Sequence, residues 1–330
     1  MTMRIELGER SYDVIIERGC IEKAPSLLNL ERKVLIVTDE GVPTEYADFL
    51  AKGSKEAHVA VLPQGEGSKS MAHLENLLCK MLQEGFTRSD CVVAVGGGMV
   101  GDIAGFAAAT YMRGIDFYNV PTTLLSQADS SIGGKTAVNL GGTKNIAGAF
   151  WQPKAVLIDT ETIKSLPKEQ IASGMAEIIK AGMIADAELF GMTENPGSAS
   201  IDEMLTRSLL VKKRVVESDE REGGLRKILN FGHTIGHGIE SVTGMLHGHA
   251  VALGMTVMCS DEARARLLTA LEIAGLPTKV DCDKNEVYEA MLRDKKMKDG
   301  KIDAVWVDEP GACKIVEFMP EELKKRIEML

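Results

Sequence analysis

Four of the six histidines in this chain lie between positions 233 and 249. Imidazole is the commonest metal ligand and changes its charge near neutral pH. His233 and His237 are four residues apart in a segment with helical periodicity, so they would share one face of a helix. The spacing resembles that of zinc sites, although the glutamate of the metalloprotease motif is absent. His247 and His249 favour a metal site over a structural histidine pair, and a carboxylate from a distant helix would complete a three-ligand site with one open position.

A second candidate pair lies in Met175-Ala-Glu-Ile-Ile-Lys180, where Glu177 and Lys180 are three residues apart. Such a pair is usually a surface ion pair of small energy. The segment is otherwise apolar, which favours an inward-facing pair.

A glycine cluster follows the apolar run at 92–95. Gly96, Gly98 and Gly101 satisfy G-x-G-x-x-G, which lets a pyrophosphate approach the N-terminus of the next helix. The usual acid about 20 residues further on is absent, because the next strand ends Val120-Pro-Thr-Thr123. Asp39 is an alternative ribose ligand. A tight turn with close packing is the competing interpretation.

Two other polar segments could bind ligands. Residues 63–69 read as a loop in which Glu66 and Lys69 could contact cofactor hydroxyls, although a solvated loop is the simpler interpretation. The glycine-rich stretch 128–145 contains Asp129, Lys135, Lys144 and Asn145, a composition that suits a phosphate or carboxylate. A mobile surface loop is the alternative there, and the apolar runs on both sides argue against it.

The elements that must position these residues follow two patterns. Apolar runs predict buried strands, and a helical pattern at 70–84 lies between two of them, which is typical of a parallel, Rossmann-like sheet. After about Pro167 the pattern is mainly helical, apart from a late hairpin. We therefore predict an α/β plus all-α fold, with a Rossmann-like NAD-binding domain at 1–167, a mainly helical metal- and substrate-binding domain at 168–330, and the active site in the cleft between them. The predicted strands are 33–38, 57–62, 90–95, 115–120 and 155–158, the predicted helices are 171–184, 204–216, 229–242, 250–270 and 284–293, and the hairpin is 302–307 with 313–318.

The composition argues against several classes of protein, namely nucleic-acid-binding, membrane-spanning, secreted and zinc-finger proteins. The chain has 330 residues, 45% hydrophobic residues and a net charge of −10, which disfavours non-specific nucleic-acid binding. No run approaches the roughly 18 apolar residues that span a bilayer, and residues 1–9 lack the apolar core of a signal peptide. The six cysteines form no C-x-x-C pair, which argues against a zinc finger. We expect a soluble cytoplasmic protein with no nucleic-acid or membrane partner.

Taken together, these motifs resemble the 3-dehydroquinate synthase family of the sugar-phosphate cyclase superfamily. The resemblance runs from about Asp39 to Lys296 and is densest at 96–145 and 229–255. The family has a Rossmann-like N-terminal domain and a helical C-terminal domain, in agreement with the pattern above. Two departures are local: His249 replaces the family's usual glutamate, and the segment between His237 and His247 is shorter than in many members.

The resemblance implies residue roles. The metal is zinc, or cobalt in some members, with Glu177, His233 and His247 as ligands, so His237 becomes a substrate contact. The family forms homodimers in which a residue like Arg113 reaches the neighbouring active site. The catalytic residues would be Asp129, Lys135, Lys180, Lys212 and His237. The substrate-binding residues would be Arg113, Lys144, Asn145, Glu222, Arg226, Asn230, Lys295 and Lys296. The NAD-binding residues would be Asp39, Glu66, Lys69, Gly97, Gly98, Met99, Asp102, Thr122, Thr123, Leu125, Lys135, Lys144, Thr162 and Ser165.

The chemistry implied by the resemblance is a closed redox cycle on 3-deoxy-D-arabino-heptulosonate 7-phosphate, in the shikimate pathway of aromatic amino acid biosynthesis. Oxidation at C5 by NAD⁺ permits β-elimination of phosphate, and re-reduction, ring opening and an intramolecular aldol reaction give 3-dehydroquinate. Three alternatives remain. The first is a cyclase that makes an inosose or a valiolone, the second is an NAD-dependent polyol or glycerol-phosphate dehydrogenase, and the third is a catalytically silent metal- or nucleotide-binding regulator.

Overall fold

The computed structural model describes residues 1–195, 197–294 and 299–330. The chain forms two compact units, Met1–Leu166 and Pro167–Leu330. In the part of the chain that the structure describes, no helix is both long and apolar enough to cross a membrane.

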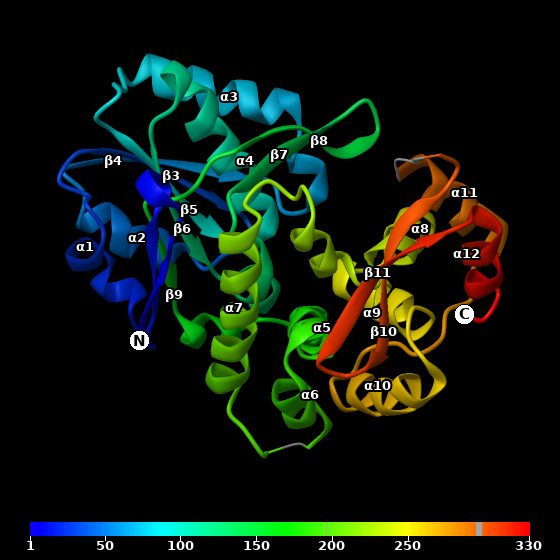
Figure 1. The fold of residues 1–330 in the computed structure, drawn as a ribbon. Coiled ribbons are helices and arrows are strands. Elements are labelled where there is room, and N and C mark those ends of the chain that lie inside the picture. The colour runs from blue at the N-terminus through cyan, green and yellow to red at the C-terminus, as the bar shows by residue number, and fades with distance from the viewer. Residues whose placement is uncertain (196, 295–298) are drawn as a thin grey trace. The chain divides into compact units, whose positions relative to one another are not determined.

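The N-terminal unit is built on a seven-stranded sheet with the order β1-β2-β9-β6-β5-β3-β4 (Figure 1). All neighbouring strands are parallel except β1 and β2, which form an antiparallel edge. The five strands expected from apolar runs are confirmed, with ends that agree to within one residue, and the N-terminal hairpin is additional. The strands are β1 (Thr2–Ile5), β2 (Tyr12–Ile16), β3 (Lys33–Asp39), β4 (Glu56–Leu62), β5 (Cys91–Gly96), β6 (Asp116–Pro121) and β9 (Ala155–Ile158).

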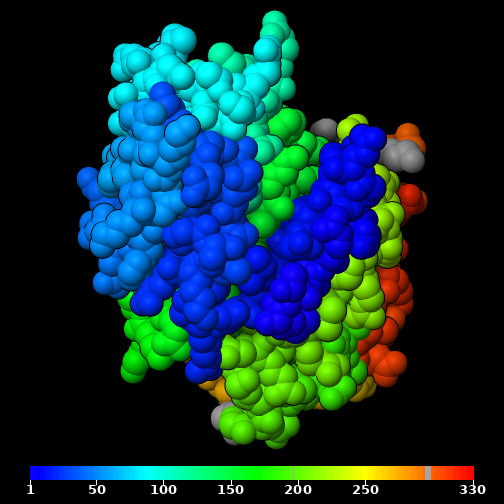
Figure 2. Space-filling view, turned by 90° about the vertical axis from the view of Figure 1, so that its left-hand side faces the viewer, coloured from blue at the N-terminus to red at the C-terminus, as the bar shows by residue number. Residues whose placement is uncertain are grey.

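Apolar side chains of the central strands point alternately to the two faces of the sheet, so the core consists of two apolar layers. In β3, Leu35 and Val37 pack in the layer that contains α3 and α4, whereas Val34 and Ile36 pack in the layer that contains α1 and α2. Successive side chains of a strand point to opposite faces, so a strand covered on both faces is apolar throughout. The helices are α1 (Ala24–Leu27), α2 (Thr44–Lys52), α3 (Met71–Gln83) and α4 (Gly98–Thr110). In the space-filling view the N-terminal elements, in blue, form a continuous surface (Figure 2).

The glycine-rich stretch expected as a ligand loop is more ordered than its composition suggests. It contains a π-helical turn, η5 (Ser126–Ser130), followed by a hairpin of β7 (Lys135–Leu140) and β8 (Thr143–Phe150) (Figure 1). Gly141 and Gly142, with φ of 59° and 78°, form the two-residue connection. Both central residues of such a turn need positive φ, which is why two glycines between β-forming residues predict a hairpin.

The C-terminal unit is mainly helical, with one hairpin formed by β10 (Ile302–Glu309) and β11 (Ala312–Phe318). This hairpin confirms the expectation from the sequence. The helices are α5 (Lys168–Ala185), α6 (Ala187–Glu194), α7 (Ile201–Ser218), α8 (His233–Thr243), α9 (His247–Thr256), α10 (Asp261–Ile273), α11 (Lys284–Asp294) and α12 (Pro320–Ile327).

Two of the predicted helices were wrong in their extent. The segment expected as one helix at 250–270 divides into α9 and α10, because Ser260 adopts an extended conformation and its side chain caps α10 by accepting from the Ala263 amide. The helix expected at 229–242 begins only at His233. A 3₁₀ segment, η7 (Leu225–Asn230), precedes it, and Gly232 between them has a φ of 77°.

Close helix contacts in this unit depend on two glycines. A Cβ atom on Gly254 of α9 would lie 2.0 Å from the carbonyl oxygen of Gly232, at the start of α8. A Cβ atom on Gly248 would lie 2.0 Å from the carbonyl oxygen of Ser173 on α5. Any side chain there would push the helices apart, so glycine permits α9 to lie against both α5 and α8.

Candidate metal centre and nucleotide site

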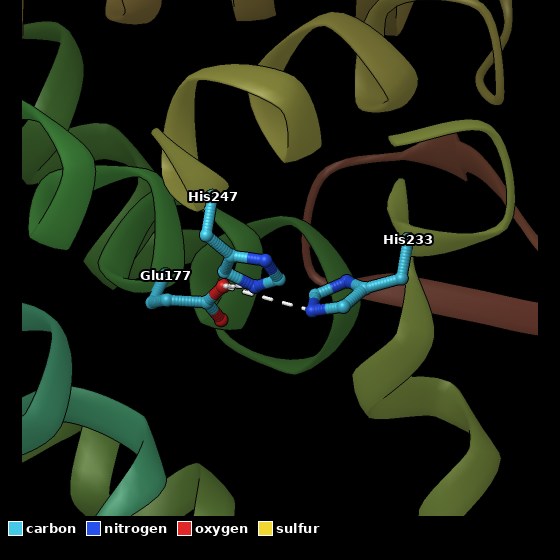
Figure 3. A group of neighbouring side chains, drawn as sticks. All are labelled: Glu177, His233 and His247. Atoms are coloured by element: carbon cyan, nitrogen blue, oxygen red, sulfur yellow. Dashed lines mark ion pairs between the residues drawn. The ribbon is translucent and has the colours of Figure 1, made fainter. Parts of the chain in front are cut away.

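Glu177, His233 and His247 meet in the C-terminal unit, each from a different helix (Figure 3). Oε1 of Glu177 lies 3.7 Å from Nε2 of His233 and 3.7 Å from Nε2 of His247. Glu177 is 1% exposed and His233 is 7% exposed, whereas the His247 side chain is 32% exposed. The close packing of α5, α8 and α9 therefore gathers one carboxylate and two imidazoles from distant parts of the sequence.

These three donors match what a zinc or cobalt ion requires. Metal–ligand bonds of about 2.0–2.2 Å place neighbouring donors of a tetrahedral site roughly 3.3 Å apart. The two distances of 3.7 Å need only a small contraction to reach that value. Three protein ligands also leave a fourth position open, as in catalytic zinc sites.

The far nitrogen of each imidazole has its own partner. Nδ1 of His233 lies 3.1 Å from the carbonyl oxygen of Phe231, and Nδ1 of His247 lies 2.9 Å from Oε2 of Glu240. Both partners are acceptors, so both rings hold their proton on Nδ1 when neutral and keep the lone pair of Nε2 toward Glu177. Metal-binding histidines usually have this arrangement.

The two imidazoles differ in their affinity for protons. Burial and the positive charge of Lys180 hold the pKa of His233 well below its usual range. Burial also lowers the pKa of His247, but the carboxylates of Glu177 and Glu240 outweigh that effect and raise the pKa to about 9. In the metal-free protein at neutral pH, His233 is therefore neutral, whereas His247 is protonated on both ring nitrogens and positively charged.

A second group of donors shares His247 with the first. It consists of His237, Glu240 and His247, each partly exposed. His237 lies four residues after His233 on α8, and the rings of His237 and His247 are 5.8 Å apart between centroids. Reasoning from the residues alone left His237 open as a ligand, and the geometry separates it from the group around Glu177.

Three buried cations lie in the same unit as this centre, and one of them contacts it. Lys180 forms an ion pair with Oε2 of Glu177, and its side chain is 3% exposed. Lys212 on α7 and Arg226 in η7 are 6% and 2% exposed, and α7 and η7 both pack against α5. The inward-facing Glu177–Lys180 pair expected from the apolar helix is confirmed.

The segment before η7 is held by one aspartate. Asp219 accepts the backbone amides of Gly223, Gly224 and Arg226, and these hydrogen bonds lower the pKa of its carboxyl group. The nearby Glu222, with a φ of 60°, accepts a hydrogen bond of 2.9 Å from Nδ2 of Asn230. Asp219 thus fixes the turn that carries three predicted substrate contacts, Glu222, Arg226 and Asn230. Two other predicted substrate contacts, Lys295 and Lys296, lie outside the described residues.

The glycine turn of the N-terminal unit lies where a nucleotide-binding turn is expected. Gly97 precedes α4 and Gly98 begins it, directly after the buried strand β5. A Cβ atom on Gly98 would lie 3.0 Å from Oγ of Ser130, so the turn is closely packed although its glycines have no side chains. Met99 follows in the first turn of α4. The helix has no side-chain cap at its N-terminus, which leaves its amides for a ligand.

Polar residues surround this turn. Lys69 is 4% exposed and pairs with Oδ2 of Asp102 at 2.5 Å, so it is a buried cation rather than part of a solvated loop. Asp39 ends β3, and burial raises the pKa of its carboxyl group. Thr122, Thr123 and Leu125 follow β6, where the Thr122 amide donates to the carbonyl oxygen of Gly96.

Lys135 and Asp102 line the same small cavity of about 10 Å³, together with Gly101 and Ser130. Asp129 lies in the π-helical turn next to Ser130. These contacts bring the start of β7, the π-helical turn and α4 together within the N-terminal unit.

The other predicted contacts of this unit are more dispersed. Glu66 accepts a hydrogen bond from Asn139 of β7, and Asn139 in turn accepts the backbone amide of Asn145, which follows the exposed Lys144 in β8. In η6 (Thr160–Ser165), Thr162 donates to the Asp159 carbonyl and Ser165 donates to the Thr162 carbonyl, which are structural contacts. Arg113 is exposed after α4 with a φ of 70°.

Sequence reasoning missed three residues of the helical unit: Ser173, Asp219 and Glu240. The helical spacing could have predicted Glu240, since it follows His233 by seven residues and His237 by three and so shares their helix face. Ser173 precedes Glu177 by one helical turn, and its Oγ accepts the Gly248 amide at 3.1 Å. Asp219 had no local pattern that distinguished it from an ordinary surface aspartate.

Comparisons with known proteins agree with this geometry. The 3-dehydroquinate synthase N-terminal family model matches residues 59–173, and the 3-dehydroquinate synthase C-terminal model matches residues 174–297. The 3-dehydroquinate synthase of Thermoanaerobacter pseudethanolicus is 41% identical over an alignment that covers 97% of this chain and 98% of the relative.

Solved structures of two cyclases have the same fold. The 2-epi-5-epi-valiolone synthase from Streptomyces hygroscopicus subsp. jinggangensis, with NAD⁺ and Zn²⁺ bound, superposes with a TM-score of 0.88 at 27% identity, covering 98% of this chain and 96% of the other. A 2-deoxy-scyllo-inosose synthase complexed with carbaglucose-6-phosphate, NAD⁺ and Co²⁺ has a TM-score of 0.87 at 25% identity, with 100% of both chains covered. Two family models that together span most of the chain, and a full-length relative at 41% identity, place this protein in the 3-dehydroquinate synthase family.

Proposed function

We propose that this protein converts 3-deoxy-D-arabino-heptulosonate 7-phosphate to 3-dehydroquinate and phosphate. The observation that carries the proposal is the buried group of Glu177, His233 and His247, at zinc-compatible distances, in a chain that matches both family models. The reaction needs a metal, a nucleotide and several cations for an anionic substrate, and the chain supplies residues suited to each.

The metal would be held by Glu177 and the Nε2 atoms of His233 and His247. NAD⁺ would lie on the turn at Gly97–Gly98, with Asp39, Lys69 and Asp102 near it. When bound, the metal polarises the substrate hydroxyls and NAD⁺ accepts and returns a hydride. Relatives of known structure contain NAD⁺ with Zn²⁺ or Co²⁺, which supports this pair of cofactors without choosing between the metals.

The protein's own side chains would bind and orient the substrate. Lys180, Lys212 and Arg226 are buried cations of the C-terminal unit, and Lys180 pairs with Glu177 of the metal centre. Arg226 is a good partner for a carboxylate or phosphate because of its planar fork of donors. A substrate with both groups explains why a protein with a net charge of −10 buries three cations in one unit. Asp129, Lys135 and His237 would be further contacts to the substrate.

The native assembly would be a homodimer. Arg113 is exposed, as required of a residue that reaches a neighbouring active site. Light scattering of the purified protein would test this part of the proposal, and an Arg113→Ala variant that keeps full turnover would argue against the shared site.

The experiment that tests the proposed activity measures phosphate release with less NAD⁺ than substrate, with and without a chelator. Many turnovers for each NAD⁺, abolished by chelation and restored by zinc or cobalt, are the expected result. A dehydrogenase would instead accumulate NADH in proportion to product. Release from glucose 6-phosphate but not from the heptulosonate would assign the protein to another cyclase reaction.

A further inference from the structure

His247 is held from two sides by residues outside the metal-binding group. Its ring bonds through Nδ1 to Oε2 of Glu240 at 2.9 Å, and the Glu240 side chain is only 15% exposed. The backbone next to it is fixed by the hydrogen bond from the Gly248 amide to Oγ of Ser173. Ser173 lies one helical turn before Glu177 on α5, so the helix that supplies the carboxylate also fixes the start of the helix that supplies His247.

His247 is nevertheless the least constrained of the three donors. It is the first residue of α9, and its side chain is 32% exposed, compared with 9% for His233 and 1% for Glu177. The backbone contact through Ser173 leaves the ring free to rotate about its side-chain bonds. Only a partner on the ring itself removes that freedom, and the hydrogen-bonding partner of Nδ1 is Glu240.

We propose that Glu240 is a positioning residue that locks the ring of His247, so that Nε2 meets the metal beside Glu177. The inference rests on the proposed metal centre and adds to it a carboxylate that touches the ligand but not the metal. A carboxylate on the far nitrogen also makes the imidazole a stronger donor and selects the tautomer with the proton on Nδ1.

The distances distinguish this role from that of a ligand. The separation of 2.9 Å between Nδ1 and Glu240 is that of a hydrogen bond, whereas donors of one tetrahedral zinc ion lie roughly 3.3 Å apart. The Nε2–Glu177 distance of 3.7 Å leaves room for an ion. The two nitrogens of one imidazole face opposite ways, so one ion cannot lie between His247 and both carboxylates.

The test measures the dissociation constants of Zn²⁺ and Co²⁺ for the whole protein and for Glu240→Ala and Glu240→Gln. We expect Glu240→Ala to weaken metal binding by about 10- to 100-fold, the usual effect of losing such a partner. Glu240→Gln keeps an acceptor for Nδ1–H but not the charge, so it should recover part of that loss. The visible absorption of bound Co²⁺ should change in Glu240→Ala and return toward the original spectrum in Glu240→Gln.

The matched control is Glu272→Gln, which makes the same change at an exposed position in the last turn of α10. It should bind metal as the original protein does. Thermal unfolding of the metal-free variants separates a loss of folding from a loss of binding, and the near-isosteric Glu240→Gln keeps the test valid if Glu240→Ala does not fold.

The outcomes are distinct. Unchanged affinity and an unchanged Co²⁺ spectrum in both Glu240 variants, with binding still lost in Glu177→Ala, would overturn the positioning role and leave the proposed function standing. Complete loss of metal in both Glu240 variants, equal to that in His233→Ala, would make Glu240 a ligand. Failure of the unaltered protein to bind either metal would overturn the metal centre itself and this inference with it.

Discussion

The two units prepare their sites by different means. In the C-terminal unit, side chains from α5, α8 and α9 meet, and the backbone only brings the helices close enough. In the N-terminal unit, the main feature is bare backbone at Gly97–Gly98, and side chains such as Asp39 and Lys69 surround it. A metal needs a few donors at fixed distances, whereas a dinucleotide needs an open surface and oriented amides.

This difference determines how each site responds to change. The proposed metal centre depends on single atoms, so removing one side chain should abolish it. The proposed nucleotide site would distribute its contacts over a turn, so adding atoms should damage it more than removing any one side chain. Metal content and NAD⁺ affinity, measured in the same variants, therefore distinguish the two sites.

The largest effect is expected for His233→Ala. Loss of one of three donors should remove bound metal and lower turnover by about a thousandfold or more, because a metal contributes several kcal/mol to the transition state. NAD⁺ affinity should change little. Elemental analysis, turnover and a fluorescence titration with NAD⁺ check this result. His249→Ala is the control, since His249 belongs to neither donor group, and full metal content in His233→Ala would refute the ligand assignment.

Lys135→Ala should lower turnover by about a hundredfold, the effect of losing a hydrogen bond to a charged group. Metal content should be unchanged and NAD⁺ affinity should fall much less than turnover, because the main role proposed for Lys135 is its contact with the substrate. The exposed Lys52→Ala provides a charge-matched control. If NAD⁺ binding were lost instead, Lys135 would belong to the cofactor site.

Gly98→Val tests the backbone site. Its Cβ would lie 3.0 Å from Oγ of Ser130, and its branches would extend over the start of α4. We expect NAD⁺ affinity to fall about tenfold or more, with metal content unchanged. Gly67→Ala, at a position with nothing within 4 Å of the added atom, should leave affinity unaltered. An unimpaired Gly98→Val would mean that the turn serves packing alone.

The smallest effect concerns pH. The pKa of His247 is raised to about 9, so the metal-free site holds one proton at neutral pH that the metal must displace. Metal affinity should therefore rise as pH rises toward 9, by about tenfold between pH 7 and pH 8. His233 adds nothing in this window, because its pKa is lowered and it is already neutral. Titrations with Zn²⁺ at the two pH values measure the slope, and equal affinities would contradict the protonation of His247.

The sequence predicted local features better than distant ones. The five strands, the glycine turn and the late hairpin follow from short-range patterns and are confirmed. The expected burial of β4 was wrong, because β4 lies at the edge of the sheet and its Val59 and Val61 are exposed. The break between α9 and α10 was also local, but the capping role of Ser260 was overlooked. The Gly141–Gly142 pair likewise predicts the hairpin of β7 and β8, whereas the glycine content of the stretch predicts only a ligand loop.

The metal centre marks the limit of such reasoning. Periodicity alone puts His233 and His237 on one helix face and would pair them as ligands. The choice of His247 and Glu177 depends on how closely α5, α8 and α9 approach, which is decided at Gly248 and Gly254. Only the family resemblance supplied that choice in advance, because no spacing within one segment encodes contacts between helices. Glu240 and Ser173 depend on the same packing.

The approach of α9 to α5 at Gly248 also has a consequence for biosynthesis. Glu177 and His247 are 70 positions apart, so the donor set cannot assemble until the ribosome has released α9. An ion bound there would cross-link α5, α8 and α9 and so close the long stretch of chain between Glu177 and His247. Metal binding would then be a late step in the folding of the helical unit, and chains without metal would keep a looser fold that is more open to proteolysis.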